Sequence, residues 1–175
     1  MARLKNAERQ HFVQEYTPGQ TEPGKEWLEL AKYISTIGDD TQEGTEEEAF
    51  YDGDGTPETS VISVAEAYTP EGYYDPEDEA QELIAGLKRK TGDGRKIWHK
   101  VVRSDGKKEW IGRATVSAII AGAGDASAYE TFSCNIRFDQ IPEENDLTDG
   151  TPGGVLSPEI VTINPTTSGA TVEVE

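Results

Sequence analysis

Residues 129–139 read YETFSCNIRFD, and this stretch decides the fold class of the chain. Its apolar side chains alternate strictly with polar ones, a period of two that is typical of a β-strand with one buried face. The apolar members are Phe132, Cys134, Ile136 and Phe138. Cys134 is the single cysteine, so no disulfide can form within the chain, and we predict that it is a small core residue.

A charged hairpin precedes this strand. The segments KIWHKVV (96–102) and EWIG (109–112) flank RSDGKK. Asp105-Gly106 predicts the turn between them, because a tight hairpin turn requires two central residues that accept positive φ. The β-rich segment ATVSAII (114–120) and a GAGDAS turn lead on to residue 129. Residues 96–139 therefore predict an antiparallel meander.

The clearest helix signal is DPEDEAQELIAGLKRK, residues 75–90. Asp75 suits the N-cap, Pro76 suits the first helical position, and the acids that follow complement the positive end of the helix dipole. Lys88, Arg89 and Lys90 are expected in the last turn, before a stop at Gly92. One apolar stripe at helical spacing predicts packing against a flat partner. Its members are Ala80, Leu83, Ile84 and Leu87.

Other segments are assigned by composition. WLELAKYISTI (27–37) predicts a first strand, although its four-residue apolar spacings also suit a short helix, and TSVISVAEAY (59–68) predicts a second strand. The expected organisation is an N-terminal arm (1–24), a β domain (25–146) and a C-terminal linker and tail (147–175) that forms one or two strands or remains flexible. The predicted fold class is mainly β, an antiparallel β-sandwich or partial barrel with one flanking α-helix at about residues 75–90.

Composition predicts a single domain with a thin core. The chain has 175 residues, a net charge of −18, and only 33 Leu, Ile, Val and Phe residues together. Such a chain has little apolar surface to bury, so we expect help from neighbouring subunits. Neither the N-terminus nor any later segment has the apolar run of a secretory signal or a membrane span, so a cytoplasmic protein is expected.

The charge is unevenly distributed. Residues 39–58 carry nine acids and no base, residues 66–82 carry seven acids and no base, and residues 88–113 carry ten bases against three acids. Each block can be a solvated face, or acidic and basic surfaces of neighbouring copies can meet. A nucleic-acid site is not predicted, because the chain as a whole repels polyanions.

Catalytic chemistry is not indicated. His11 and His99 lie far apart in sequence without metal-binding spacing, and His99 is read as an ordinary strand position. No nucleophile elbow, phosphate loop or dinucleotide fingerprint occurs. With 34 acids, some carboxylate pair always exists, so a glycosidase pair carries no specificity. We expect no enzyme activity and no cofactor.

The turn FYDGDGTPE (50–58) must be tested against a calcium loop. Asp52, Asp54 and Thr56 match the first, third and fifth positions of an EF-hand loop, but Pro57 stands at the sixth and Ser63 at the twelfth. The favoured interpretation is a tight turn made by its glycines and capped by its own Asp and Thr side chains, without a metal.

Taken in order, several blocks resemble a known family. FYDGDGTPETSV, YYDPEDEAQELIAGLKRKTGDGRKIWHKV with the hairpin after it, and GAGDASAYETFSCNIRFDQIP are similar to the major tail protein (tail tube protein) of long-tailed bacteriophages with non-contractile tails. The resemblance covers residues 27–142. The N-terminal arm and everything after Asp146 lie outside it.

The resemblance implies a structural virion protein. Members of the family form hexameric rings that stack into the tail tube, whose inner wall is a β-barrel made jointly by six copies. The tape-measure protein and DNA occupy the lumen without specific binding, and a tail terminator and distal tail proteins are further partners. The implied localisation is the virion tail, assembled in the cytoplasm of the host bacterium.

Two sets of residues are expected to carry this assembly. The candidate inter-subunit loop comprises Asp39, Asp40, Glu46, Glu47, Glu48, Tyr51, Asp52, Gly53, Asp54 and Gly55. The candidate basic stacking surface comprises Arg95, Lys96, Lys107 and Lys108.

Two alternatives stay open from the sequence. One is a monomeric calcium- or carbohydrate-binding β-sandwich that uses Trp27, Trp98 or Trp110 as a stacking platform. The other is a different virion component, such as a head-tail joining or baseplate protein.

Overall fold

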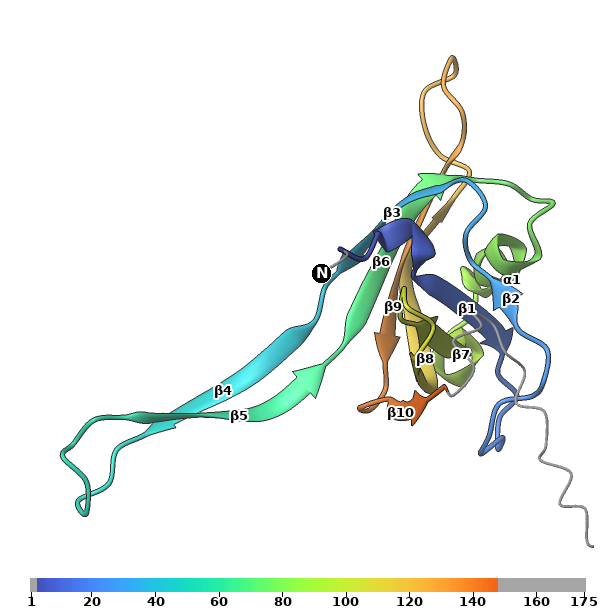
Figure 1. Ribbon diagram of the computed structural model, residues 1–175. Helices are drawn as coiled ribbons and strands as arrows, with labels where there is room; N and C mark the ends of the chain where they lie inside the picture. The colour runs from blue at the N-terminus through green and yellow to red at the C-terminus, as the bar shows by residue number, and fades with distance from the viewer. Residues whose placement is uncertain (1–2, 148–175) are drawn as a thin grey trace, which may run out of the picture.

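The computed structural model describes residues 3–147 as a mainly β chain, whose antiparallel sheet curls into a half-barrel with one α-helix, α1 (Glu79–Leu87), against it (Figure 1). This confirms the predicted fold class. The strands are β1 (Gln10–Glu15), β2 (Leu28–Glu29), β3 (Ile34–Asp39), β4 (Gln42–Glu48), β5 (Glu58–Ala65), β6 (Ala67–Tyr73), β7 (Lys96–Val102), β8 (Lys108–Ala121), β9 (Thr131–Phe138) and β10 (Glu143–Asp146). Two short 3-10 turns, η1 (Asn6–Glu8) and η2 (Gly92–Arg95), complete the described elements.

The main sheet has the order β2-β1-β7-β8-β9-β6-β3, and β10 pairs with the first part of β8. β4 and β5 pair only with each other and form a separate two-stranded sheet. The predicted meander is therefore the centre of the main sheet, since β7, β8 and β9 are consecutive neighbours. β8 is longer than expected because it runs through a bulge at Ala118, whose φ is +49°.

The core lies inside the curl of the sheet, under α1. In β9 the burial alternates as the sequence predicts, and Cys134 is buried, which raises the pKa of its thiol to about 12. Ala80, Ile84 and Leu87 of α1 are all at most 4% exposed, and Leu83 is partly buried beside them. The predicted apolar stripe of the helix is thus confirmed. Burial of each large aliphatic side chain contributes about 1.5–3 kcal/mol.

The helix begins later than the sequence suggests. Asp78 is the N-cap, since its Oδ1 accepts a hydrogen bond from the Gln81 backbone N–H at 2.9 Å. The prediction of Asp75 as the N-cap is wrong. Its carboxylate instead accepts a hydrogen bond from the Glu77 N–H at 2.9 Å and binds Lys32 Nζ at 2.6 Å. Pro76 accordingly lies before the helix. The helix ends at Leu87, so Lys88 is the C-cap and the cations of 88–90 stand at its end and beyond.

The β7–β8 hairpin forms as predicted, but its turn is wider. Gly106 has φ +67°, whereas Asp105 does not have positive φ. The Gly106 N–H donates to Arg103 O at 2.7 Å, and the Arg103 N–H donates to Lys108 O at 2.9 Å. The loop therefore holds four residues built around an i to i+3 turn, a common hairpin class that needs only one left-handed residue.

The two ends of the described chain add strands that the sequence does not reveal. β1 lies within the segment expected to be an arm, and it pairs with β7 along its whole length. Residues 143–146, at the end of the expected β domain and not predicted as a strand, form β10. Residues 1–2 and 148–175, which include nearly all of the predicted C-terminal tail, lie outside the described residues.

The predicted strand at 27–37 is divided in two. Ile34 N–H donates to Ala31 O at 3.1 Å, closing a turn between β2 and β3, and Tyr33 has φ +57°. β6 lies very close to this turn, since a Cβ on Gly72 would stand 2.1 Å from Tyr33 O. Only glycine fits there.

Gly86 offers a stabilising substitution. It lies in the last turn of α1, is exposed, and a Cβ added to it would meet nothing within 4 Å. Because glycine loses more backbone entropy in a helix than alanine does, we expect Gly86→Ala to raise the free energy of unfolding by about 0.5 kcal/mol. Urea denaturation measures this change, and a decrease in stability would contradict the open surroundings of this position.

A candidate assembly hairpin and its basic counterparts

The β4–β5 hairpin projects from the main sheet as a ribbon of two strands (Figure 1). It is a continuation of the β3–β6 pair, because β4 follows β3 and β5 leads into β6 after one residue, Glu66. We call residues 40–66 the assembly hairpin. Among the described residues, none of the core side chains belongs to β4 or to residues 49–65.

The base of the hairpin is fixed to the sheet. The Asp40 N–H donates to Ala67 O at 2.9 Å, and Asp40 Oδ2 accepts from Asn135 Nδ2 of β9 at 2.8 Å. Asp39 Oδ1 accepts from the Thr41 N–H at 2.9 Å, and this hydrogen bond lowers the pKa of Asp39. The direction in which the hairpin leaves the sheet is therefore set by hydrogen bonds.

β5 exposes an apolar surface. Val61, Ile62 and Val64 are 57%, 64% and 40% exposed. Val61 lies opposite Thr45 and Val64 opposite Glu43, with Ile62 between them at a bulge. A two-stranded ribbon without a packed face is marginally stable in water. The exposed β-branched side chains therefore lie on a ribbon that has no packed face among the described residues.

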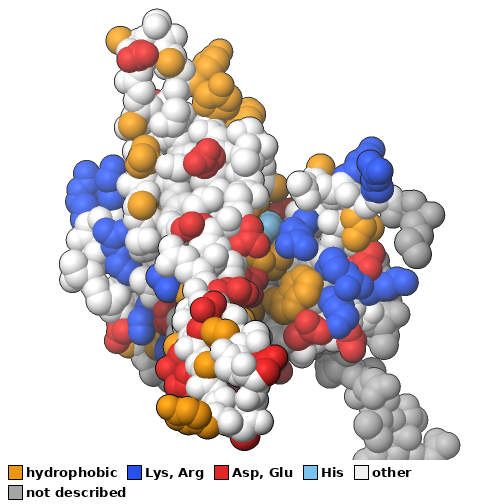
Figure 2. Space-filling view, turned by 90° about the vertical axis from the view of Figure 1, so that its left-hand side faces the viewer, with side chains coloured by type: hydrophobic (Ala, Val, Ile, Leu, Met, Phe, Trp, Pro, Cys, Tyr) orange, Lys and Arg blue, Asp and Glu red, His pale blue; other side chains and the backbone are white. Residues whose placement is uncertain are grey.

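β4 carries the negative charge of the hairpin. Glu46, Glu47 and Glu48 are consecutive and exposed, and Glu48 lies directly opposite Glu58. Like charges facing each other across two strands destabilise the pair. Figure 2, which views the molecule from the side on which the hairpin projects, shows acidic and apolar side chains together on it and Lys and Arg side chains on both flanks.

The tip forms the predicted turn. The Gly53 N–H donates to Phe50 O at 3.2 Å, Asp54 Oδ1 accepts from the Thr56 N–H at 2.9 Å, and Gly55 has φ +84°. Within residues 3–147 no group of three or more His, Cys, Asp or Glu side chains is arranged to hold a metal ion. Phe50 is 58% exposed and Tyr51 is fully exposed, so the tip presents two aromatic rings among acids.

The structure therefore places all ten residues of the candidate loop together. Eight lie on the hairpin beyond its base, and Asp39 and Asp40 lie at the base itself. Their assignment to an inter-subunit contact stays a prediction.

The four residues of the candidate basic surface are separated. Arg95 Nε and Nη2 each donate at 2.6 Å, to Lys90 O and Lys88 O, so this guanidinium binds the carbonyl end of α1. Lys96 Nζ lies 3.0 Å from Asp93 Oδ1 and 3.7 Å from Asp139 Oδ2. Arg95 and Lys96 are therefore both bound to groups of their own chain.

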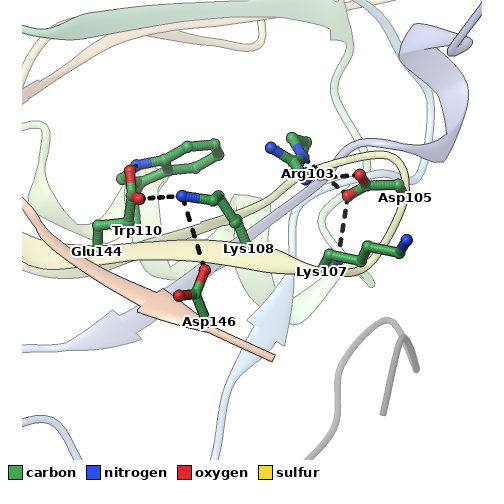
Figure 3. A network of polar contacts seen from close by, with 7 residues as sticks. All are labelled: Arg103, Asp105, Lys107, Lys108, Trp110, Glu144 and Asp146. Carbon is green, nitrogen blue, oxygen red and sulfur yellow. Dashed lines mark hydrogen bonds and ion pairs between the residues drawn. The ribbon is translucent and has the colours of Figure 1, made fainter. Parts of the chain in front are cut away.

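Lys107 and Lys108 lie at the other end of β7–β8. Figure 3 shows Lys108 between Glu144 and Asp146 of β10, with Trp110 Nε1 donating to Glu144 Oε2 at 2.9 Å. These contacts lower the pKa of Glu144 and hold β10 on β8. Arg103 is occupied by Asp105, whose pKa it lowers to about 2. Lys107 is exposed, and it makes no ion pair with any of residues 3–147.

The three tryptophans do not share an exposed face. Trp98 is 7% exposed, beside Tyr16. The Trp27 ring lies 4.7 Å from Lys100 Nζ, and Trp110 is tied to Glu144. A stacking platform for a sugar requires an open ring, so this geometry gives the carbohydrate alternative no support.

A pair of buried histidines was not anticipated. His11 Nδ1 lies 3.4 Å from His99 Nε2, inside the curl of the sheet. Both rings pack on Tyr68, and His99 also stacks on Phe138. Burial, and then Arg9, lowers the pKa of His11 to about 4, and burial lowers that of His99 well below its usual value. The sequence separation of 88 residues hides this contact, which only the β1–β7 register reveals.

Within residues 3–147 no helix is long and apolar enough to cross a membrane.

Comparison with known proteins gives matches among solved structures only. No family model matches the chain, and no curated protein matches it. The SPP1 tail tube is 14% identical, with 98% of this chain and 95% of that chain covered at a TM-score of 0.60. The tail of an empty gene transfer agent particle, described with C6 symmetry, is 12% identical. The match covers 81% of this chain and 98% of that chain, with a TM-score of 0.58. The tube-terminating cap of an anti-feeding prophage is 13% identical. The match covers 84% of this chain and 93% of that chain, with a TM-score of 0.51.

These likenesses establish the fold. The half-barrel with its flanking helix is the fold of tail tube and tail cap subunits, and the similarity extends over most of the chain. The resemblance seen in the sequence is thereby confirmed at the level of the fold.

Proposed function

We propose that this chain is the structural subunit of a phage tail tube, and that it assembles by contacts between identical copies into hexameric rings that stack. The observation that carries the proposal is the assembly hairpin, an acidic two-stranded ribbon with exposed valine and isoleucine that has no packed face of its own. The tail fold and the C6 symmetry of the gene transfer agent tail support it.

Ring stacking is a head-to-tail contact in which two different surfaces of the same chain meet. Such a contact repeats without closing along an axis and produces a tube. The hairpin projects on one side of the main sheet and α1 lies on the other (Figure 1). A chain with a projecting element and an opposite receiving face suits this kind of growth.

The curled sheet suits the wall of a tube. Its edge strands are β3 at one end and the two-residue β2 at the other. Unpaired edges invite pairing with another chain, and closure into a joint barrel removes them. We propose that the sheets of six copies close such a barrel around a lumen.

The lumen is proposed to hold the tape-measure protein and to pass DNA without specific binding. The net charge of −18 supports this, because a negatively charged wall gains nothing from release of the counterions of DNA. Tail terminator and distal tail proteins would contact the two ends. In this proposal the chain is not an enzyme, and it assembles in the host cytoplasm.

Electron microscopy of the purified full-length chain over a concentration series tests the proposal, with mass photometry to count subunits. We expect six-membered rings or tubes whose fraction rises with concentration. A particle that remains monomeric at millimolar concentration, with and without added salt, would contradict it.

A tail cap is a second candidate, favoured by the likeness to the tube-terminating cap. A cap forms one ring and does not stack. Single rings without tubes at every concentration would support this candidate over the tube subunit.

A further inference from the structure

A small cavity lies where the end of α1 meets the end of β1 and the start of β7. Its volume is about 250 Å³. Leu83, Leu87 and Ile97 provide apolar lining, and Tyr16 and Lys90 lie at its border. Small-molecule sites have volumes of about 300–1,000 Å³, so this cavity has the size for a single side chain rather than for a ligand.

The surroundings of the cavity are positively charged. Lys88, Arg89 and Lys90 are exposed and make no ion pair with any of residues 3–147. Two acids also line the cavity: Asp93 is bound by Lys96 at 3.0 Å, and Glu15 is exposed without an ion pair to any of residues 3–147. The hydrogen bonds from Arg95 to Lys88 O and Lys90 O fix the chain that carries these cations. The cavity thus has an apolar interior with the unpaired Lys90 at its border, and Lys88 and Arg89 add positive charge next to Lys90 in the chain.

The tip of the assembly hairpin has the complementary character. Phe50 and Tyr51 are the large apolar side chains at its end, and Asp52, Asp54 and Glu58 follow them in the same turn and the start of β5. The tip is held in shape by its own turn, so its aromatic rings are presented without a large ordering cost on binding. An aromatic side chain entering an apolar cavity, with acids meeting lysines at the rim, matches the anatomy of an interface hot spot.

The tip cannot reach the cavity of its own chain. The hairpin projects away from the sheet on one side, and α1 lies on the opposite side (Figure 1). The occupant must therefore come from a second copy. We propose that the aromatic tip of the assembly hairpin, at Phe50 and Tyr51, docks into the cavity at the end of α1 of a neighbouring copy. This inference rests on the proposed self-assembly and names the surface that receives the hairpin.

A second hollow is a weaker acceptor. It is lined by Ser35, Glu71, Gly72, Tyr73, Thr131 and Ser133 together with Phe132. Its only charged lining residue is Glu71, so, unlike the cavity with Lys90 and Lys96, it offers no cation to an acidic tip. It serves as the matched comparison for the test.

Cysteine cross-linking tests the docking directly. Thr17 lines the cavity, Ser35 lines the second hollow, and both are exposed. The native Cys134 is buried, and its pKa of about 12 keeps it from reacting at pH 8. We expect Tyr51→Cys/Thr17→Cys, oxidised after assembly, to give a ladder of disulfide-linked oligomers on non-reducing electrophoresis. Tyr51→Cys/Ser35→Cys and the single variants are expected to give none.

The outcomes separate this inference from the proposed function. Tubes or rings that form without a Tyr51–Thr17 link, or that link through position 35 instead, overturn the docking site and leave the proposed function standing. A parent protein that never assembles overturns both. Electron micrographs of each variant before oxidation distinguish these cases.

Charge reversal gives an independent measurement. We expect Lys90→Glu to raise the protein concentration needed for assembly about tenfold, and Asp52→Lys in the same chain to restore most of it. Lys107→Glu, at the other end of β7–β8, is the matched control, and we expect less than a twofold effect. A larger effect at Lys107 than at Lys90 would place the acceptor at the β7–β8 turn and overturn the proposal.

Discussion

Removing the apolar surface of β5 is expected to abolish assembly while leaving the subunit folded. The change is Val61→Thr/Ile62→Thr/Val64→Thr, which keeps side chains that favour strands and replaces one methyl group of each valine and the ethyl group of the isoleucine by a hydroxyl. The three side chains together represent about 3 kcal/mol of burial in an interface, or about a hundredfold in the association constant. Sedimentation velocity measures the fraction assembled.

The folded state should be unaffected, because these side chains contact no core residue. All three are exposed and lie outside the hydrophobic cluster. We therefore expect the melting temperature to stay within about 2 °C of the parent. Ser60→Thr/Ser63→Thr on the same strand is the matched control and should assemble normally. Assembly of the triple variant at the parent concentration would show that the interface lies elsewhere.

Much of this architecture could be predicted where local sequence decides the structure. The strict alternation of residues 131–138 fixes both the strand and its buried face, and the stripe of α1 fixes the face of the helix that packs. The turn at the hairpin tip also follows from local chemistry, because Asp54 caps Thr56 and Gly55 adopts positive φ. In these cases the necessary contacts lie within a few residues.

The errors arise where distant residues decide. β10 reads EEND and has no strand propensity of its own, and it is a strand because Lys108 and Trp110 bind Glu144. The helix start was misassigned because Lys32, far away in sequence, binds Asp75 and leaves Asp78 as the cap. The acidic segment was predicted to be a loop, but it forms β4. Its strand conformation depends on pairing with β5, which lies later in the sequence.

In the candidate site, too, some features follow from the local sequence and others depend on distant residues. The sequence identified the acidic residues and the basic block, but it could not tell which cations are already neutralised. Arg95 donates a hydrogen bond to Lys88 O at the end of α1, and Lys96 forms an ion pair with Asp93. Lys108 forms an ion pair with Glu144 of β10. The unpaired cations at 88–90 belong to the predicted basic block, but they were not among the residues named for the stacking surface. Ion pairing is a property of the fold, so composition alone overestimates the free basic surface.

The buried histidines lead to the second large effect, a loss of stability in mild acid. The folded-state pKa of His11 is about 4, against 6.5 in the unfolded chain, and that of His99 is lowered as well. Above about pH 7.5 the histidines are almost entirely neutral in both states, so almost nothing is lost. Below it the unfolded state binds protons that the folded state excludes, so the free energy of unfolding falls as the pH falls. Between pH 7.5 and pH 5 His11 should remove about 2 kcal/mol, and His99 adds to the loss in the same direction.

Other groups near the pair do not produce this change. Tyr68 stays protonated because burial and its hydrogen bond to Glu66 raise its pKa. The carboxylates with lowered pKa values, such as Asp39, Asp75 and Glu144, lose their stabilising contribution only below about pH 4.5. Neutralising part of the −18 charge relieves repulsion and acts in the opposite direction. The interval from pH 5 to pH 7.5 therefore isolates the histidines.

The measurement is urea denaturation of parent and variant chains across that interval. In His11→Gln/His99→Gln, neither side chain titrates, so the fall in stability should disappear even though the variant is less stable at pH 7.5. An exposed-site variant, Glu79→Gln, controls for general charge effects and should keep the full pH slope of the parent. Parallel curves for the parent and the histidine variant would mean that the two rings accept protons without cost, which is incompatible with a pair 3.4 Å apart in the interior of the sheet.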